Sequence, residues 1–142
     1  MDVRKRILIV DDDEQVLFVM RNTLRKLADA CEVMTASSGR EALEIVKEND
    51  FALILTDLRM ADMDGIELTE RIAKLCPETV VLWMTAYGCH NVRDDVDRLE
   101  VHRCVDKPME IGEIRQVVRD ALASTERTEN VEMGRISYGY AD

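Results

Sequence analysis

Short apolar runs alternate with amphipathic segments along this chain of 142 residues. The runs are too short for helices, and most of their successive positions are apolar, as in strands that are buried on both faces. We predict five strands, at residues 7–10, 32–36, 51–56, 80–84 and 101–105.

The segments between these runs repeat apolar residues every three or four positions, as on one face of a helix. The first segment carries Val16, Met20, Leu24 and Leu27. Ser38-x-x-Glu41 and Asp64-x-x-Glu67 resemble capping boxes that open the next two helices. A weak pattern at 91–98 and a clear one at 111–122 complete the set. Strands that alternate with helices over short connections predict an α/β domain, a parallel sheet covered on both faces.

Polar residues follow four of the predicted strands. They are Asp11, Asp12 and Asp13 after the first strand, Asp57 at the third, Thr85 at the fourth and Lys107 at the fifth. The carboxyl ends of parallel strands share one edge of the sheet, and ligands bind there. We therefore expect one compact acidic pocket that also holds a hydroxyl and a cation.

The chemistry of this pocket suits a divalent metal ion and a phosphoryl group. Clustered carboxylates repel one another unless a cation intervenes. Asp11, Asp12 and Asp57 offer hard oxygen ligands, which favour Mg²⁺, or Mn²⁺, over zinc or copper.

An aspartate can also be a nucleophile that forms an aspartyl phosphate. Lys107 and Thr85 would then stabilise charge on the phosphoryl oxygens. Asp13, next to the first helix, is predicted to be a helix cap instead.

The charge and the apolar runs narrow the choice of partners. The net charge of −10 disfavours direct nucleic-acid binding by this domain. No apolar run is long enough to cross a membrane, and residues 1–10 do not form a signal peptide.

The four cysteines, Cys31, Cys76, Cys89 and Cys104, contain no C-x-x-C pair. We expect Cys31 and Cys104 to be free thiols within strands, where they act as small hydrophobic residues. A soft metal site built from Cys89-His90 and His102-x-Cys104 is an alternative that their spacing does not favour. Reduced thiols without a targeting segment predict a cytoplasmic protein.

Four segments together resemble the receiver domain of two-component response regulators. They are Ile7-Leu8-Ile9-Val10-Asp11-Asp12-Asp13, the stretch from Leu55 to Gly65, Met84-Thr85-Ala86 and Asp106-Lys107-Pro108. The resemblance covers about residues 5–123, with the family's order and spacing. It implies a flavodoxin-like (βα)₅ domain with the five parallel strands in the order 2-1-3-4-5.

The resemblance also implies a role for each residue of the pocket. Asp57 would accept a phosphoryl group from a sensor histidine kinase or a phosphotransfer protein. Asp12, Asp57 and the backbone carbonyl of Arg59 would bind Mg²⁺, with Asp11 reaching it through water. Thr85 would hydrogen-bond the phosphoryl group, and Lys107 would pair with it before a cis Lys107–Pro108 peptide. Such a domain is a signalling phosphoprotein that catalyses only its own phosphorylation and dephosphorylation.

The chain departs from the family pattern at two positions. Cys104 stands where the family usually has an aromatic switch residue, and Ala61 stands where it often has proline. We expect the Ala61 change to loosen the loop after Asp57. In the family the surface that changes on phosphorylation, and through which some members form homodimers, corresponds to residues 91–98, 101–105 and 111–122.

Several alternatives remain open at this stage. We place the receiver domain at residues 1–123 and a polar tail, or the start of a linker, at 124–142. The chain is either a single-domain regulator that acts on a downstream protein or a receiver followed by an output domain. A haloacid-dehalogenase-type phosphatase could use Asp11 and Asp13, although Gln15 fits that motif poorly. A receiver-like binding module that is never phosphorylated is the third possibility.

Overall fold

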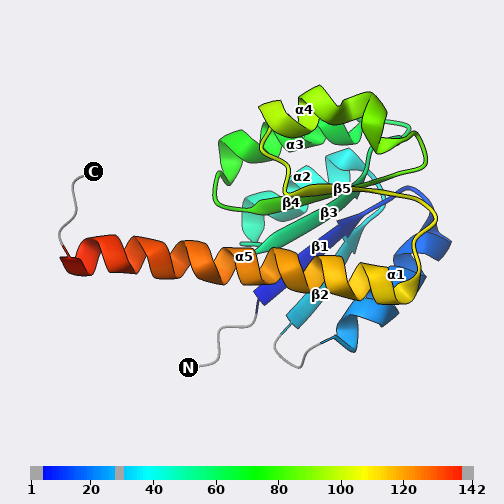
Figure 1. Ribbon diagram of the computed structural model, residues 1–142. Coiled ribbons are helices and arrows are strands. Elements are labelled where there is room, and N and C mark those ends of the chain that lie inside the picture. Colours follow the sequence, from blue (N-terminus) through cyan, green and yellow to red (C-terminus); the bar gives the residue numbers. More distant parts are fainter. Residues whose placement is uncertain (1–4, 28–30, 139–142) are drawn as a thin grey trace.

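The computed structural model describes residues 5–27 and 31–138. Five parallel strands form one sheet in the order β2-β1-β3-β4-β5 (Figure 1). They are β1 (Lys5–Val10), β2 (Cys31–Ala36), β3 (Leu53–Asp57), β4 (Val80–Thr85) and β5 (Arg103–Asp106). This confirms the predicted fold class and strand order.

Helices cover both faces of this sheet. α1 (Glu14–Arg25) and α5 (Ile111–Tyr138) lie on one face, and α2 (Gly39–Glu48), α3 (Gly65–Leu75) and α4 (Arg93–Arg98) lie on the other (Figure 1). The 3₁₀ turn η1 (Cys89–Val92) leads directly into α4. Two apolar clusters follow from this layering, one on each side of the sheet. Strands that contribute to both clusters must be apolar at successive positions, as the sequence shows.

The helix starts use the capping residues that the sequence indicates. Asp13 accepts hydrogen bonds from the backbone N–H groups of Gln15 (2.9 Å) and Val16 (3.4 Å), which confirms its role as a cap. Ser38 accepts from the N–H of Glu41 at 3.0 Å, and Glu41 in turn accepts from Ser37. These side chains satisfy N–H groups that the first turn of a helix leaves unpaired.

Helix α5 continues past its predicted end at residue 122 and reaches Tyr138. Among the α5 residues whose burial is described, which end at residue 125, the buried ones are Ile114, Val117, Val118 and Ala121. The apolar spacing therefore marks only the part that packs on the sheet, and helical backbone can continue beyond it. Among the described residues, no helix combines the length and the apolar character that a membrane crossing requires.

Trp83 anchors α3 to the middle of the sheet. Its side chain is fully buried, and its Nε1–H donates to Thr69 Oγ at 2.8 Å. The Thr69 hydroxyl donates in turn to the carbonyl oxygen of Gly65 at 2.7 Å. This chain of bonds satisfies a buried polar group and fixes the first turn of α3, which lies beside the end of β3.

Candidate functional site

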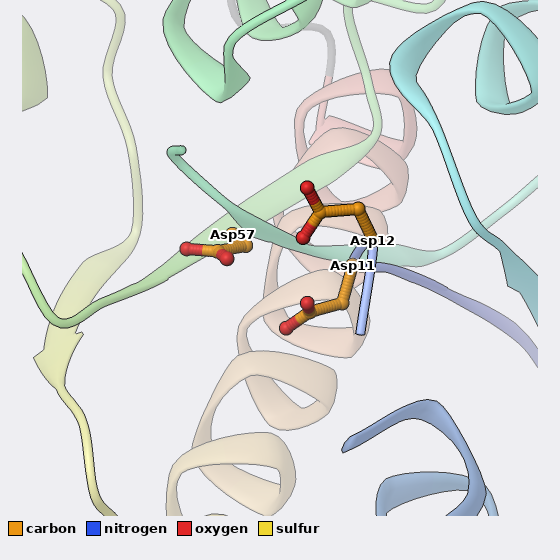
Figure 2. A group of neighbouring side chains, drawn as sticks. All are labelled: Asp11, Asp12 and Asp57. Atoms are coloured by element: carbon orange, nitrogen blue, oxygen red, sulfur yellow. The ribbon is translucent and has the colours of Figure 1, made fainter. Parts of the chain in front are cut away.

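Three carboxylates meet at the carboxyl edge of the sheet. Asp57 is the last residue of β3, and Asp11 and Asp12 directly follow β1, the neighbouring strand. Each offers one oxygen, and these three oxygens lie within 4.8 Å of one another (Figure 2). Asp11 and Asp57 are buried, at 1% and 8% exposure, whereas Asp12 is exposed. The cluster therefore lies at the base of a site that opens to solvent beside Asp12.

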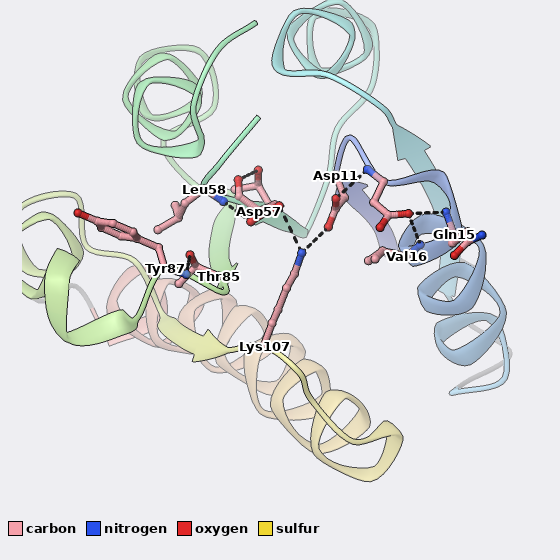
Figure 3. A network of polar contacts seen from close by, with 10 residues as sticks. Asp11, Gln15, Val16, Asp57, Leu58, Thr85, Tyr87 and Lys107 are labelled. Carbon is pink, nitrogen blue, oxygen red and sulfur yellow. Dashed lines mark hydrogen bonds and ion pairs between the residues drawn. The ribbon is translucent and has the colours of Figure 1, made fainter. Parts of the chain in front are cut away.

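Lys107 brings the predicted cation to this cluster. Its ammonium lies 2.8 Å from Asp11 Oδ2 and 3.3 Å from Asp57 Oδ2 (Figure 3). Its backbone N–H donates to the carbonyl oxygen of Thr85 at 2.9 Å, which ties the end of β5 to the end of β4. The Lys107–Pro108 peptide is cis, as predicted. One lysine thus bridges two of the three carboxylates.

The charges of the cluster are only partly compensated. Burial raises the pKa of Asp57 above its ordinary value, and the Asp11 carboxylate adds to this, although Lys107 opposes it. Burial would lower the pKa of Lys107, but the hydrogen bond and the charge of Asp11 raise it overall. The lysine is therefore fully charged at neutral pH. One cation facing three carboxylates leaves room for another positive charge.

The backbone around Asp57 is packed closely against the start of α3. The N–H of Leu58 donates to Asp57 Oδ1 at 2.8 Å, and the N–H of Gly65 donates to the carbonyl oxygen of Leu58 at 2.9 Å. A Cβ atom on Gly65 would overlap the carbonyl oxygen of Asp57 and lie 2.9 Å from the Cα of Leu58. Glycine at position 65 is what lets α3 begin so close to the acceptor strand.

Thr85, the predicted hydroxyl group, is buried at the end of β4 on the same edge of the sheet (Figure 3). Its Oγ accepts a hydrogen bond from the backbone N–H of Tyr87 at 2.9 Å. The hydroxyl hydrogen remains available as a donor, since a hydroxyl can donate and accept at once. The side chain therefore links the site to the loop that follows β4.

A contact that sequence reasoning did not find spans the two loops beside the site. The guanidinium of Arg59 lies over the ring of Tyr87, 4.0 Å from its centroid. Arg59 is exposed, and Tyr87 is 47% exposed. Because the two residues are 28 positions apart, no local sequence pattern signals their pairing. The predicted role of the Arg59 carbonyl as a metal ligand stays a prediction.

The loop after Asp57 also has an anchor. Asp62 accepts hydrogen bonds from the N–H groups of Gly39 (3.3 Å) and Arg40 (3.0 Å) at the start of α2. Its slight burial would raise the pKa of Asp62, but these backbone donors lower it below its ordinary value. A charged carboxylate at the start of a helix is favourable. Asp62 thus ties down the loop that the Ala61 substitution was expected to loosen.

The cysteine prediction was wrong for Cys104. Cys89 and Cys104 form a disulfide, while Cys31 and Cys76 are free. The sequence could not reveal this pairing, because connectivity does not follow from spacing alone. The only group of three possible metal ligands among the described residues is Asp11, Asp12 and Asp57. The structure therefore gives no support to a soft metal site that includes these two cysteines.

The chain is similar to known proteins over most of its length. Residues 7–119 match the family model of the response regulator receiver domain. The transcriptional regulatory protein ZraR of Escherichia coli is 39% identical over 121 residues, which cover 84% of this chain and 26% of ZraR. A CheY-like receiver domain protein from Methanospirillum hungatei is 28% identical with a TM-score of 0.82, covering 88% of this chain and 98% of that one. The beryllofluoride-activated NtrC4 receiver domain dimer is 25% identical with a TM-score of 0.77, covering 84% and 98%.

These matches and the acidic edge define a class: the chain belongs to the response regulator receiver family. It spans about a quarter of the length of the curated relatives that it matches, such as ZraR. The haloacid-dehalogenase alternative is not favoured, because Asp13, its required second aspartate, caps α1.

Proposed function

We propose that this receiver domain accepts a phosphoryl group on Asp57 from a sensor histidine kinase or a phosphotransfer protein. The observation that carries the proposal is the meeting of Asp11, Asp12 and Asp57 with the ammonium of Lys107. Burial alone would favour the protonated form of a carboxyl group, which is a poor nucleophile. Here a lysine and a potential metal site keep Asp57 ionised, which a nucleophile requires.

The carboxylate cluster also fits a divalent cation. Three oxygens within 4.8 Å of one another, without nitrogen or sulfur ligands, match the preference of Mg²⁺ or Mn²⁺. We infer that Asp12, Asp57 and the carbonyl of Arg59 hold the ion, with Asp11 reaching it through water. When bound, the ion would neutralise charge on the carboxylates and on the incoming phosphoryl oxygens.

The residues of the site divide the transfer step among them. One carboxylate oxygen of Asp57 attacks phosphorus, and the phosphorus–nitrogen bond to the donor histidine breaks as its electron pair returns to the imidazole. The Lys107 ammonium, already shared between Asp11 and Asp57, can follow the negative charge onto a phosphoryl oxygen. Thr85 supplies a hydroxyl donor while its oxygen still accepts from Tyr87.

The response would leave through the side of the domain that carries α4, β5 and α5. α4 has no buried residue and β5 is only partly buried, so these two elements have few core contacts to lose in a change of state. The same surface could support a homodimer. The NtrC4 receiver supports this proposal, because its activated form is described as a dimer.

We place the receiver domain at residues 1–123 and assign 124–142 to a linker or tail. The continuation of α5 to Tyr138 supports a helical connection. Because ZraR is a longer transcriptional regulator, we propose a cytoplasmic pathway in which this domain controls an output domain or a downstream protein. Neither nucleic acid nor membrane is proposed as a direct ligand, because the chain carries a net charge of −10.

The test is incubation with Mg²⁺ and acetyl phosphate, followed by intact-mass measurement and mapping of the labelled residue. We expect one phosphoryl group on Asp57 and none in Asp57→Asn. Asp13→Asn is the control, since Asp13 adjoins the cluster in sequence but caps α1, and this variant should be labelled normally. Labelling of Asp11 instead would favour the phosphatase mechanism, and labelling of no aspartate would favour a pure binding module.

A further inference from the structure

The Cys89–Cys104 pair lies between two parts of the domain that phosphorylation is proposed to move. Cys89 begins η1 in the loop after β4, and Cys104 lies on β5. Their Cα atoms are 5.8 Å apart, a separation that permits a disulfide without backbone movement. Both residues are partly exposed, so a small oxidant or reductant can reach them. The pair undergoes thiol oxidation, a chemistry in which the carboxylates and the lysine of the acidic site take no part.

The disulfide lies only a few residues along the chain from Thr85, the hydroxyl group of the phosphoryl site. Only three residues, Ala86 to Gly88, separate Thr85 from Cys89. Within this span the N–H of Tyr87 is bonded to the Thr85 hydroxyl, and the N–H of Cys89 donates to Asp106 Oδ1 at 2.8 Å. A displacement of Thr85 toward a phosphoryl group must therefore pull on a loop whose far end is fixed to β5.

The packing of α4 itself is light, although Val92 of the preceding turn η1 is buried in the core and Val96 packs against the same cluster. None of the residues of α4 is buried, and its contact with α3 includes an exposed ion pair between Arg98 and Glu70 at 3.1 Å. Exposed ion pairs contribute little to stability. The disulfide therefore adds a covalent restraint to the packing of Val92 in the segment from Cys89 to Arg98.

We propose that Cys89 and Cys104 are a thiol-oxidation site whose redox state decides whether phosphorylation reaches α4. This inference rests on the proposed function and on its cytoplasmic setting. Disulfides in that compartment are usually transient and redox-sensing rather than structural. In the disulfide form, η1 and the start of α4 are fixed to β5, and the signal stops at the loop. In the dithiol form, the loop follows Thr85.

The oxidant is a low-molecular-weight disulfide, R–S–S–R. One cysteine thiolate attacks it, forming a mixed disulfide and releasing one R–S⁻. The second thiolate attacks the protein sulfur of that mixed disulfide, forming the Cys89–Cys104 bond and releasing the second R–S⁻. The protein loses two protons and two electrons, and R–S–S–R gains the two electrons. An excess of R–SH runs the same steps backwards.

The first experiment measures whether the pair responds to such a couple. The full chain is equilibrated with mixtures of oxidised and reduced glutathione, its free thiols are alkylated, and its peptides are mapped by mass spectrometry. We expect the Cys89–Cys104 bond to form and to be reversed by reduced glutathione, with Cys31 and Cys76 alkylated throughout. A bond that never forms, or that excess reduced glutathione cannot break, overturns the switch.

The second experiment measures transmission. Hydrogen exchange is followed in the oxidised and the reduced chain, with and without Mg²⁺ and beryllofluoride. In the oxidised form we expect slower basal exchange over residues 89–98 and a beryllofluoride effect there at least about threefold smaller. Equal exchange over 89–98 in the two redox forms, with or without beryllofluoride, contradicts the proposal.

Two controls separate this proposal from the proposed function. Cys89→Ser and Cys104→Ser should behave like reduced wild type in both buffers, whereas Cys76→Ser should respond like wild type. Asp57 labelling by acetyl phosphate should be the same in both redox forms. If Asp57 is never labelled, the phosphoacceptor function fails. The basal exchange difference over 89–98 still decides whether the disulfide restrains this segment.

Discussion

The centre of the sheet and its β5 edge differ in how deeply their residues are buried. All five residues of β3 are buried, and Ile7 to Val10 of β1 are fully buried. On the β5 edge no strand residue is fully buried, and α4 has none either. Asp57, Asp11 and Asp12 thus stand on the rigid part of the domain, where a site needs fixed geometry, and Lys107 reaches them from the end of β5. The proposed response leaves through elements that have few buried side chains.

The largest effect on stability should come from Gly65→Ala, which adds a side chain beside the buried end of β3. The added methyl group has no room between α3 and the end of β3, so we expect a loss of about 2–3 kcal/mol in the free energy of unfolding. The displaced Asp57 should also be phosphorylated more slowly. Denaturant unfolding and acetyl phosphate labelling measure the two effects.

Gly112→Ala is the matched control, because nothing lies within 4 Å of a Cβ at this helical position. It should be neutral or stabilise the domain by about 0.5–1 kcal/mol. Equal losses in the two variants would show that the close approach of α3 to Asp57 does not matter.

The next effect concerns the metal ion. At ten times its dissociation constant, Mg²⁺ should stabilise the native state by about 1.4 kcal/mol, because it binds only the folded carboxylate cluster. Thermal unfolding with and without millimolar Mg²⁺ measures this shift. Asp12→Ala should lose it, whereas Asp13→Asn should keep it, since Asp13 caps α1. A shift that survives in Asp12→Ala would place the ion elsewhere.

A similar or smaller effect follows from the pKa of Asp57. Because burial raises this pKa in the folded state, folding favours the protonated form, and that stabilisation is lost as the pH rises through the folded pKa. Without Mg²⁺ at neutral pH, Asp57→Asn should therefore raise Tm above that of the wild type. The gap should close as the pH falls toward the pKa. A gap that widens at low pH would contradict the assignment.

The smallest effect tests the contact that joins the two regions. Arg59 follows β3 and Tyr87 follows β4, so their contact joins two loops, and a cation–π contact at an exposed position contributes about 0.5–1 kcal/mol. If this pair restricts the approach of water to the aspartyl phosphate, Arg59→Ala with Tyr87→Ala should speed its hydrolysis a few-fold. Phosphate release after removal of the donor gives the rate, and Arg71→Ala is a surface control. Unchanged lifetimes would exclude this steric role.

The sequence predicted the rigid region better than the edge. Buried strands such as β3 need unbroken apolar runs, and the polar residues that end those runs stand at one edge whatever the details of packing. The positions of Asp11, Asp12, Asp57 and Lys107 could therefore be predicted before any coordinates. Thr85 was also placed at this edge, although its hydrogen bond to the loop was not foreseen.

The sequence failed where long-range pairing or backbone continuation decides the structure. The Cys89–Cys104 bond and the Arg59–Tyr87 contact join separate loops, and no spacing rule links their partners. Residues 101 and 102 were predicted as strand, yet β5 begins at Arg103, although the N–H of His102 still donates to Val81. The apolar pattern predicts that α5 ends at residue 122, but its helical backbone reaches Tyr138.

Trp83 gives the protein an internal optical reporter. It is the only tryptophan of the chain, and its fully buried indole should emit at short wavelength in the native state. Its register partner on β5 is Cys104, which packs against the same apolar cluster. Disulfides quench nearby indoles, so reduction of Cys89–Cys104 should brighten the native emission without shifting it. The redox state of the β5 edge can then be followed in solution by intensity, while the wavelength reports unfolding.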